Sequence, residues 1–186
     1  CEEMCSFCII PYTRGKQKSW PVNDVIRQID LLVEKGFKEV VLTGIHIGSY
    51  GEDHGTNLFD LVRYIENKTK LQRLRISSLE PMGLRPEFMQ HLADSEIFCH
   101  HLHLPLQSGD NQVLKQMNRN YSRESFTEVV LAAKELMPDI FIGTDIMVAF
   151  PGETEEQFAN SLELCQRLPF SAMHCFPYSD RPGTVA

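Results

Sequence analysis

The spacing of apolar residues predicts alternating helices and strands along the whole chain. Between Val22 and Gly36 apolar residues recur every three or four positions, which is typical of an amphipathic helix that ends at a glycine cap. The next segment, KEVVLTG, is a short β-branched run that ends at Gly44 and suits a buried parallel strand. The same unit then recurs. Further helices are predicted over 57–68, 86–95, 110–117, 123–136 and 155–167, and further strands over 74–78, 99–107, 142–150 and 172–178.

This alternation predicts an α/β domain with a parallel sheet and right-handed crossovers. A loop rich in cysteine precedes the first helix, where a loop that follows a strand belongs. We therefore expect one strand upstream of Cys1 in addition to the five predicted strands. Six strands would form an open, partial (β/α)6 barrel that lacks its first strand here, and a doubly wound sheet of flavodoxin type is the alternative. In both architectures, functional residues belong at the carboxyl ends of the strands.

Length and composition indicate one domain, 1–186. The 42% hydrophobic content can form a substantial core, and no linker-like stretch divides the chain. We find no apolar run long enough for a membrane span and no secretory signal, so we expect a cytoplasmic protein without membrane association. The net charge of −7 argues against this domain alone binding a polyanion. Because the chain opens directly on a cysteine motif, we infer that it is a fragment of a larger protein.

The cysteine motif is CEEMCSFC, which places Cys1, Cys5 and Cys8 in a C-x3-C-x2-C pattern. A structural zinc site takes four protein ligands, usually as two separated pairs, and no second pair is present. Three thiolates on a cubane 4Fe-4S cluster instead leave one iron open for another ligand. The spacing therefore predicts a 4Fe-4S cluster at these three residues, with zinc completed by a histidine as the alternative.

Two further classes of function are alternatives to this prediction. His101 and His103 point to the same face of the strand 99–107, and such a pair can hold zinc in a barrel hydrolase, although no carboxylate motif completes that site. A non-catalytic iron–sulfur module is a third possibility, but such modules normally ligate all four irons. The other cysteines stand singly in apolar segments and are predicted to be small buried hydrophobic residues: Cys99, Cys165 and Cys175.

The cysteine motif resembles the signature of the radical S-adenosylmethionine (SAM) family, C-x3-C-x-aromatic-C. Along nearly the whole chain, LTGIHIGSYG, RISSLEP, HLHLPLQSG, LKQMNRNY, FPGETEEQF and FPYSDRPGT are similar to the methylthiotransferases of that family. The loop GIHIGSYG most resembles the MtaB type, which acts on threonylcarbamoyladenosine of tRNA. The MiaB type, which acts on isopentenyladenosine of tRNA, the RimO type, which acts on a ribosomal protein aspartate, and other radical SAM enzymes are the alternatives.

The resemblance implies a transferase that reductively cleaves SAM and begins the conversion of C–H to C–S–CH3. The open iron of the 4Fe-4S cluster would bind SAM. The electron that cleaves SAM would come from an external donor such as flavodoxin or ferredoxin. Full-length relatives carry an N-terminal domain with a second 4Fe-4S cluster and a C-terminal RNA-binding barrel. Neither is present in these residues, so tRNA would be bound mainly by the missing domains.

The resemblance also implies a SAM pocket. Phe7 would lie near the adenine, and Thr43 and Gly44 near the SAM amino group. Four polar residues would hold the methionine and ribose ends of SAM: Glu80, Gln107, Arg119 and Asp145. Their types suit this role, because a guanidinium pairs with a carboxylate and an acid accepts from ribose hydroxyls. Each also has a structural alternative: Glu80 as a turn residue, Arg119 as a solvated charge and Asp145 as a hydrogen-bonding residue in the barrel lumen.

Two other features qualify this picture. The strand 142–150 has Ala149 where the family usually has glycine, which weakens the expectation of close backbone approach to adenine there. Basic residues occur after the cysteine loop and near the end of the chain. Arg14, with Lys16 and Lys18, and Arg181 are expected on one rim, where they could contact RNA phosphates or simply be solvated.

Overall fold

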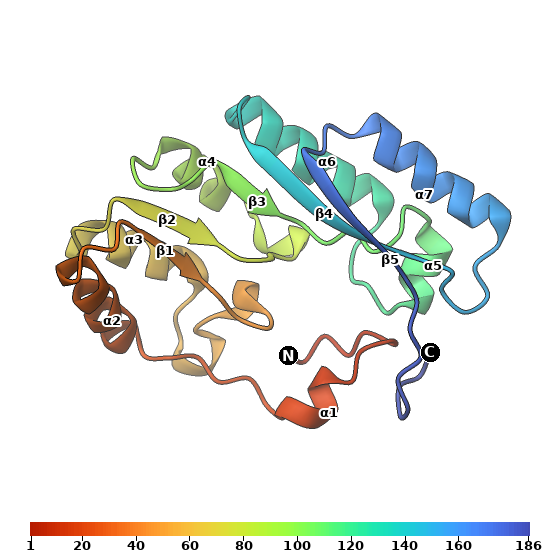
Figure 1. Cartoon of the computed structure of the whole chain (residues 1–186), viewed down its shortest axis with the longest axis horizontal. Coiled ribbons are helices and arrows are strands. Elements are labelled where there is room, and N and C mark those ends of the chain that lie inside the picture. The colour runs from red at the N-terminus through yellow and green to blue at the C-terminus, as the bar shows by residue number, and fades with distance from the viewer.

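A computed structural model describes all residues, 1–186, and shows strands alternating with helices (Figure 1). The strands are β1 (Glu39–Leu42), β2 (Arg73–Ile76), β3 (His101–His103), β4 (Phe141–Val148) and β5 (Ala172–Pro177). The helices are α1 (Ile10–Arg14), α2 (Val22–Glu34), α3 (Leu58–Lys68), α4 (Pro86–Asp94), α5 (Asn111–Gln116), α6 (Arg123–Leu136) and α7 (Glu155–Arg167). Short 3-10 turns, which were not predicted, are η1 (Ile47–Ser49), η2 (Glu52–His54) and η3 (Pro81–Gly83).

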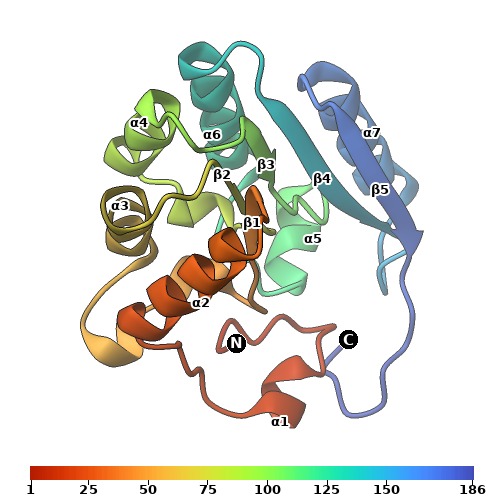
Figure 2. The same cartoon turned by 60° about the vertical axis from the view of Figure 1, so that its left-hand side comes forward.

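The parallel open sheet is confirmed, and it follows sequence order. β1 pairs with β2, and β3, β4 and β5 form a second parallel group. Between β2 and β3 the ladder is reduced to a few bonds. The Leu74 N–H donates to the Ile97 carbonyl at 2.7 Å, and the Cys99 N–H donates to the Leu74 carbonyl at 2.8 Å. These bonds join the two groups into one curved layer (Figure 2).

The largest error in the predicted elements concerns the strand 99–107, because β3 covers only three of these residues. Pro105 has no N–H to donate to a neighbouring strand. Gln107 has φ +66°, which is outside the extended region. Gln107 nevertheless forms an isolated parallel bridge with Ile146, so the segment stays beside β4 as an irregular extension.

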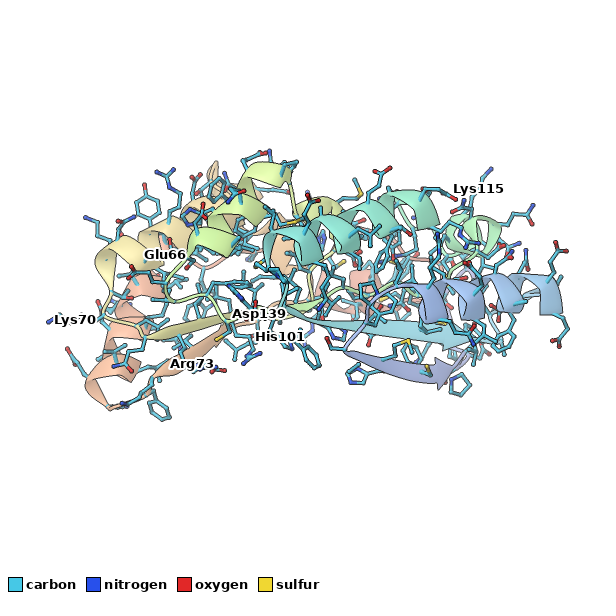
Figure 3. The ribbon with its side chains drawn as sticks, turned by 90° about the horizontal axis from the view of Figure 1, so that it is seen from above. Glu66, Lys70, Arg73, His101, Lys115 and Asp139 are labelled. Carbon is cyan, nitrogen blue, oxygen red and sulfur yellow. The ribbon has the colours of Figure 1, made fainter.

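Helices α3, α4, α6 and α7 lie on one face of the sheet and leave the other face uncovered (Figure 3). A doubly wound sheet has helices on both faces, so that alternative is wrong. The core lies between the sheet and its helices, where Leu74, Leu102 and Ile142 are completely or almost completely buried. We find no helix with the length and apolar character needed to cross a membrane.

Local signals were read correctly at two helix ends. Thr154 and Gln157 form the predicted capping box of α7, and Gly36 follows α2 with φ +88°.

The prediction that Cys175 is buried was wrong. All residues of β5 are exposed because this strand forms the outer edge of the sheet. Cys99 and Cys165 are half-buried, and burial raises the pKa of Cys165 to about 11.

Candidate cofactor site

The cysteine loop is bound to the segment that follows α5. The Ser6 N–H donates to the Met117 carbonyl at 3.0 Å. The side-chain amide of Asn118 donates to the carbonyls of Glu3 and Met4, both at 3.0 Å. Asn118 adopts φ +57°, a conformation that asparagine tolerates better than most residues. The loop is therefore held by main-chain and side-chain bonds to a distant part of the chain.

Arg119 connects this loop to the segment that follows β2. Its Nη1 lies 3.2 Å from the Cys5 Sγ, its Nη2 forms an ion pair with Glu80, and its Nε donates to the Tyr121 hydroxyl at 3.0 Å. The side chain of Arg119 is only 6% exposed, so it is not a solvated charge. The Tyr121 hydroxyl lies 2.8 Å from the Pro105 carbonyl, which fixes the ring beside the guanidinium.

Burial and charge act in opposite directions on these groups. Burial raises the pKa of the Cys5 thiol, and the neighbouring Arg119 only partly offsets this effect. Burial alone would lower the pKa of Arg119, but Tyr121, Glu80 and Cys5 raise it above its usual value. The guanidinium therefore stays charged beside a thiol that is protonated at neutral pH in the absence of a metal.

Cys1, Thr43 and Gly44 line one cavity of about 850 Å³ beside α2 and β1. Glu80 and Arg119 line a smaller cavity of about 280 Å³, which also includes Tyr121. The structure thus places these five predicted residues in two cavities, and His46 lines both of them.

Three further predicted residues, Phe7, Gln107 and Asp145, lie beside or within β4. Phe7 packs against a small apolar cluster that includes Met117 and Met147. The Gln107 N–H donates to the Asp145 carbonyl at 2.8 Å, and the Gln107 Oε1 is buried without a partner. Ala149, where the family usually has glycine, has φ +57°. The backbone therefore takes a conformation that favours glycine although the residue is alanine.

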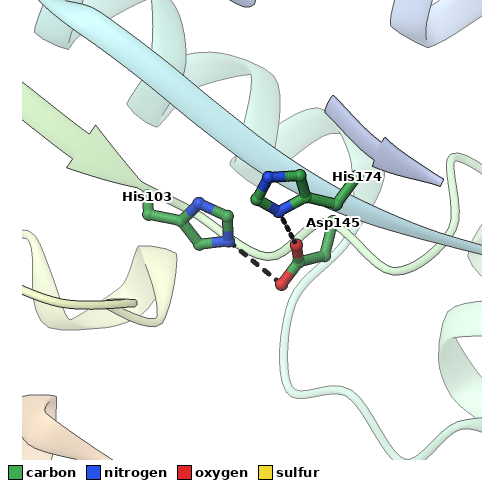
Figure 4. Close-up of side chains that lie close together, drawn as sticks. All are labelled: His103, Asp145 and His174. Atoms are coloured by element: carbon green, nitrogen blue, oxygen red, sulfur yellow. Dashed lines mark hydrogen bonds and ion pairs between the residues drawn. The ribbon is translucent and has the colours of Figure 1, made fainter. Parts of the chain in front are cut away.

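Asp145 is the centre of a network across three strands (Figure 4). Its Oδ2 lies 3.0 Å from the His103 Nε2, and its Oδ1 lies 3.1 Å from the His174 Nδ1. Burial alone would raise the pKa of Asp145, but hydrogen bonds and charge from the two histidines hold it below its usual value. One ligand atom from each residue lies within 4.8 Å of the others, so the group also has the composition of a divalent metal site.

His101 is separate from that network. Its ring stacks on Phe141 with the centroids 5.0 Å apart, and its Nδ1 is buried without a partner. Burial, helped by the nearby Arg75, lowers the pKa of His101. The proposed zinc pair of a hydrolase, His101 with His103, is therefore not formed, because the two side chains have different partners.

The basic residues at the two ends of the chain lie on neighbouring segments. The Ala186 N–H donates to the Ser6 carbonyl at 2.8 Å, so the end of the chain lies beside the cysteine loop (Figures 1 and 2). Arg14 and Arg181 are both exposed, and Arg181 donates to the Ser179 hydroxyl at 3.0 Å.

Comparison with known proteins identifies the family of this chain. The profile of the Radical SAM superfamily matches residues 1–165. The chain belongs to the radical SAM superfamily. Solved structures agree at the level of the fold: SuiB of Streptococcus suis bound to S-adenosylmethionine has a TM-score of 0.68 at 16% identity, over 100% of this chain and 40% of that one.

The relatives of this radical SAM chain include two kinds of tRNA-modifying enzyme. It is 44% identical to the threonylcarbamoyladenosine tRNA methylthiotransferase MtaB of Aquifex aeolicus, over 100% of this chain and 45% of that protein. It is 42% identical to a tRNA-2-methylthio-N(6)-dimethylallyladenosine synthase of Thermoanaerobacter sp., over 100% of this chain and 40% of that protein. The chain thus spans less than half the length of these relatives.

The residues of this radical SAM domain fit a polar cofactor at the carboxyl ends of the strands. Four of the five buried side-chain atoms without a partner lie in the cysteine loop or in the segments that follow strands: those of Ser6, Ser77, Gln107 and Glu153. Buried polar atoms are normally paired, so these four suit a hydrogen-bonding ligand. All three motif cysteines are free thiols, as a cluster requires.

Three residues of the site were not predicted from the sequence: Asn118, Tyr121 and His174. Asn118 and Tyr121 flank Arg119 in MNRNY, and that adjacency could have drawn attention to them. His174 lies in a strand without a recognised motif. Only the parallel register of β4 and β5, which places it opposite Asp145, reveals its partner.

Proposed function

We propose that this chain is the radical SAM core of a methylthiotransferase that acts on threonylcarbamoyladenosine of tRNA. One observation carries the proposal. In a domain of the radical SAM superfamily, the three-cysteine loop contacts Arg119, which forms an ion pair with Glu80. The 44% identity to the Aquifex aeolicus enzyme and the loop GIHIGSYG support this branch. The chain is comparably identical to a tRNA-2-methylthio-N(6)-dimethylallyladenosine synthase, so dimethylallyladenosine of tRNA is the second candidate substrate.

In this proposal Cys1, Cys5 and Cys8 hold a 4Fe-4S cluster. When bound, the cluster and SAM supply the reductive cleavage that starts attack on an unactivated C–H bond. Arg119 places a positive charge beside Cys5 and so stabilises the thiolate that must ligate iron. Its buried ion pair with Glu80 and its bond to Tyr121 keep the guanidinium in that position.

The proposed SAM-binding residues surround this group. Thr43 and Gly44 offer main-chain atoms at the end of β1 for the amino group of SAM. Gln107 offers an unpaired buried amide oxygen, and Phe7 offers an apolar ring next to β4. Asp145 can accept from ribose hydroxyls, because a carboxylate has about four lone-pair sites and its histidines use two of them.

Activity on RNA requires parts beyond these residues. We propose that the full-length protein adds a second 4Fe-4S cluster and an RNA-binding domain, and that flavodoxin or ferredoxin supplies electrons. Arg14 and Arg181 are the proposed phosphate contacts of the core, since their segments adjoin the cysteine loop.

Anaerobic reconstitution tests the cluster directly. We expect about four irons and four sulfides per chain, the content of one cubane. The variant in which Cys1, Cys5 and Cys8 are all alanine should remain colourless. The variant Cys99→Ala, which removes a cysteine outside the loop, is the matched control and should keep the chromophore. Stable cluster assembly in the triple variant would disprove the assignment.

The substrate is tested in a deletion strain of the source organism, with and without the full-length gene. Mass spectrometry of tRNA nucleosides should show loss of the methylthio group from threonylcarbamoyladenosine and its return on complementation. Loss from isopentenyladenosine would assign the MiaB type, and loss from a ribosomal protein aspartate would assign the RimO type. If all three marks persisted, the methylthiotransferase proposal would fail.

A further inference from the structure

The uncovered face of the sheet carries a row of polar side chains that consists of two bonded groups and His101. In Figure 3 Arg73 and His101 project from this face, away from the helices. Alternate residues along a strand share a face, so Arg75 lies on the face of Arg73 and His103 on the face of His101. Hydrogen bonds join Glu39 to Arg73 and Arg75, and ion pairs join Asp145 to His103 and His174. The row consists of Glu39, Arg73, Arg75, His101, His103, Asp145 and His174.

His174 is the most exposed histidine or carboxylate of the Asp145 network. Its side chain is 72% exposed, whereas that of His103 is 15% exposed. Its Nδ1 is held by the Asp145 Oδ1, and its ring stacks on the His103 ring with centroids 5.5 Å apart. Because Nδ1 is engaged and the ring is stacked, Nε2 is presented in a fixed direction as a hydrogen-bonding group (Figure 4).

The same face has a positive charge in excess on β2. Arg73 and Arg75 both bond Glu39 through Nε, at 2.8 Å and 3.0 Å. Two guanidinium groups therefore share one carboxylate. Since each guanidinium has five N–H donors, the terminal donors remain for an anionic group. The face thus combines fixed hydrogen-bonding groups with free guanidinium donors, and it suits a polar ligand that carries a carboxylate.

We propose that this row is the subsite for the substituent on the modified adenine, that His174 is its specificity-determining contact, and that Asp145 is the positioning residue that orients His174. The inference rests on the proposed function and names the chemistry that selects the substrate. A threonylcarbamoyl group carries a urea-type amide, a hydroxyl and a carboxylate. A dimethylallyl group carries none of these. An apolar substituent would remove water from these polar side chains without replacing its hydrogen bonds, which is unfavourable.

The test uses the full-length, reconstituted enzyme and two tRNA substrates, one with threonylcarbamoyladenosine and one with dimethylallyladenosine. In His174→Phe the aromatic shape is kept and the Nε2 contact is lost. We expect the ratio of the two kcat/KM values to fall at least about tenfold, because a site built for hydrogen bonding discriminates through those bonds. In His174→Gln the amide can replace the imidazole contact, and the ratio should recover partly.

The matched control is His91→Phe, which changes a histidine of α4 that also bonds a carboxylate, that of Glu66, outside the proposed subsite. Its specificity ratio should equal that of the unmodified enzyme. Thermal unfolding of each variant identifies a general loss of structure, which would lower both kcat/KM values without altering their ratio. An unchanged ratio in a folded His174→Phe enzyme overturns this inference and leaves the proposed function intact. An unmodified enzyme that fails to methylthiolate threonylcarbamoyladenosine overturns both.

Discussion

At the scale of the residue, Ala149 shows that a backbone conformation can persist without the residue that favours it. Its φ is +57°, and its N–H donates to the Glu153 Oε2 at 2.7 Å. The left-handed region costs an L-residue about 1 kcal/mol, a cost that glycine avoids. We therefore predict that Ala149→Gly raises the free energy of unfolding by about 0.5–1 kcal/mol, measured by urea denaturation.

The same substitution at an ordinary position gives the control. Ala159 lies exposed within α7, where glycine is a poor helix former. Ala159→Gly should lower the free energy of unfolding by about 1 kcal/mol. If both variants were destabilised equally, the left-handed conformation would not be the cause of the cost at position 149.

A second residue-scale prediction concerns the reactivity of Cys5 in the apoprotein. Its thiol pKa is raised by burial and by the charge of Glu80, whereas Arg119 lowers it. Arg119→Met should therefore raise the pKa further, reduce the thiolate fraction at pH 8 and slow alkylation of Cys5 by iodoacetamide. Glu80→Gln should act in the opposite direction. Peptide mass spectrometry can follow Cys5 separately from the other cysteines, and equal rates in both variants would contradict the electrostatic explanation.

At the scale of the element, the packing of the loop after β3 against α7 depends on Gly109. A Cβ atom at this position would lie 2.6 Å from the Ser161 Cα, and the Gly109 N–H donates to the Ser161 hydroxyl at 2.8 Å. Backbone cannot move as easily as the end of a side chain. We predict that Gly109→Ala lowers the free energy of unfolding by about 1–3 kcal/mol, the usual cost of overpacking.

Gly83, which lies in η3, provides the control for the substitution at Gly109. A Cβ atom there would meet the Leu79 side chain at 3.4 Å, which is ordinary contact. Gly83→Ala should therefore change stability much less than Gly109→Ala in the same denaturation experiment. Similar losses in both variants would show that contact distance at the loop does not control the packing of α7.

The elements were largely predictable because their signals are local. The apolar period of α2 and the capping box of α7 are short-range features, and both are found in the structure. β3 was overestimated because the path of Gln107 depends on its bridge to Ile146 in another strand. The pairing of Arg119 with Glu80 joins residues 39 positions apart, and the family resemblance alone had grouped them. His174 could not be placed from the sequence, since its partner depends on strand register.

At the scale of the whole molecule, charge limits what this domain can do alone. Its 25 acidic residues outnumber its 18 basic residues, which gives a net charge of −7. Such a surface repels a polyanion at long range, and its clearest local exception is the exposed segment with Arg14, Lys16 and Lys18. The domain can therefore make a few phosphate contacts but lacks the broad positive surface that usually supplies affinity for nucleic acid.

We predict that the isolated domain binds tRNA no more tightly than about 10⁻⁴ M at physiological salt, the weak end of non-specific binding. Fluorescence anisotropy of labelled tRNA would measure this, with the full-length protein expected to bind much more tightly. Changing both Lys16 and Lys18 to glutamine should further weaken binding by the domain and reduce the dependence of log K on log salt, because fewer counterions are released. The variant Lys115→Gln, on the helix-covered side in Figure 3, is the control and should leave the salt dependence unchanged. Submicromolar binding by the domain alone would contradict the prediction and would locate a complete RNA-binding surface within these residues.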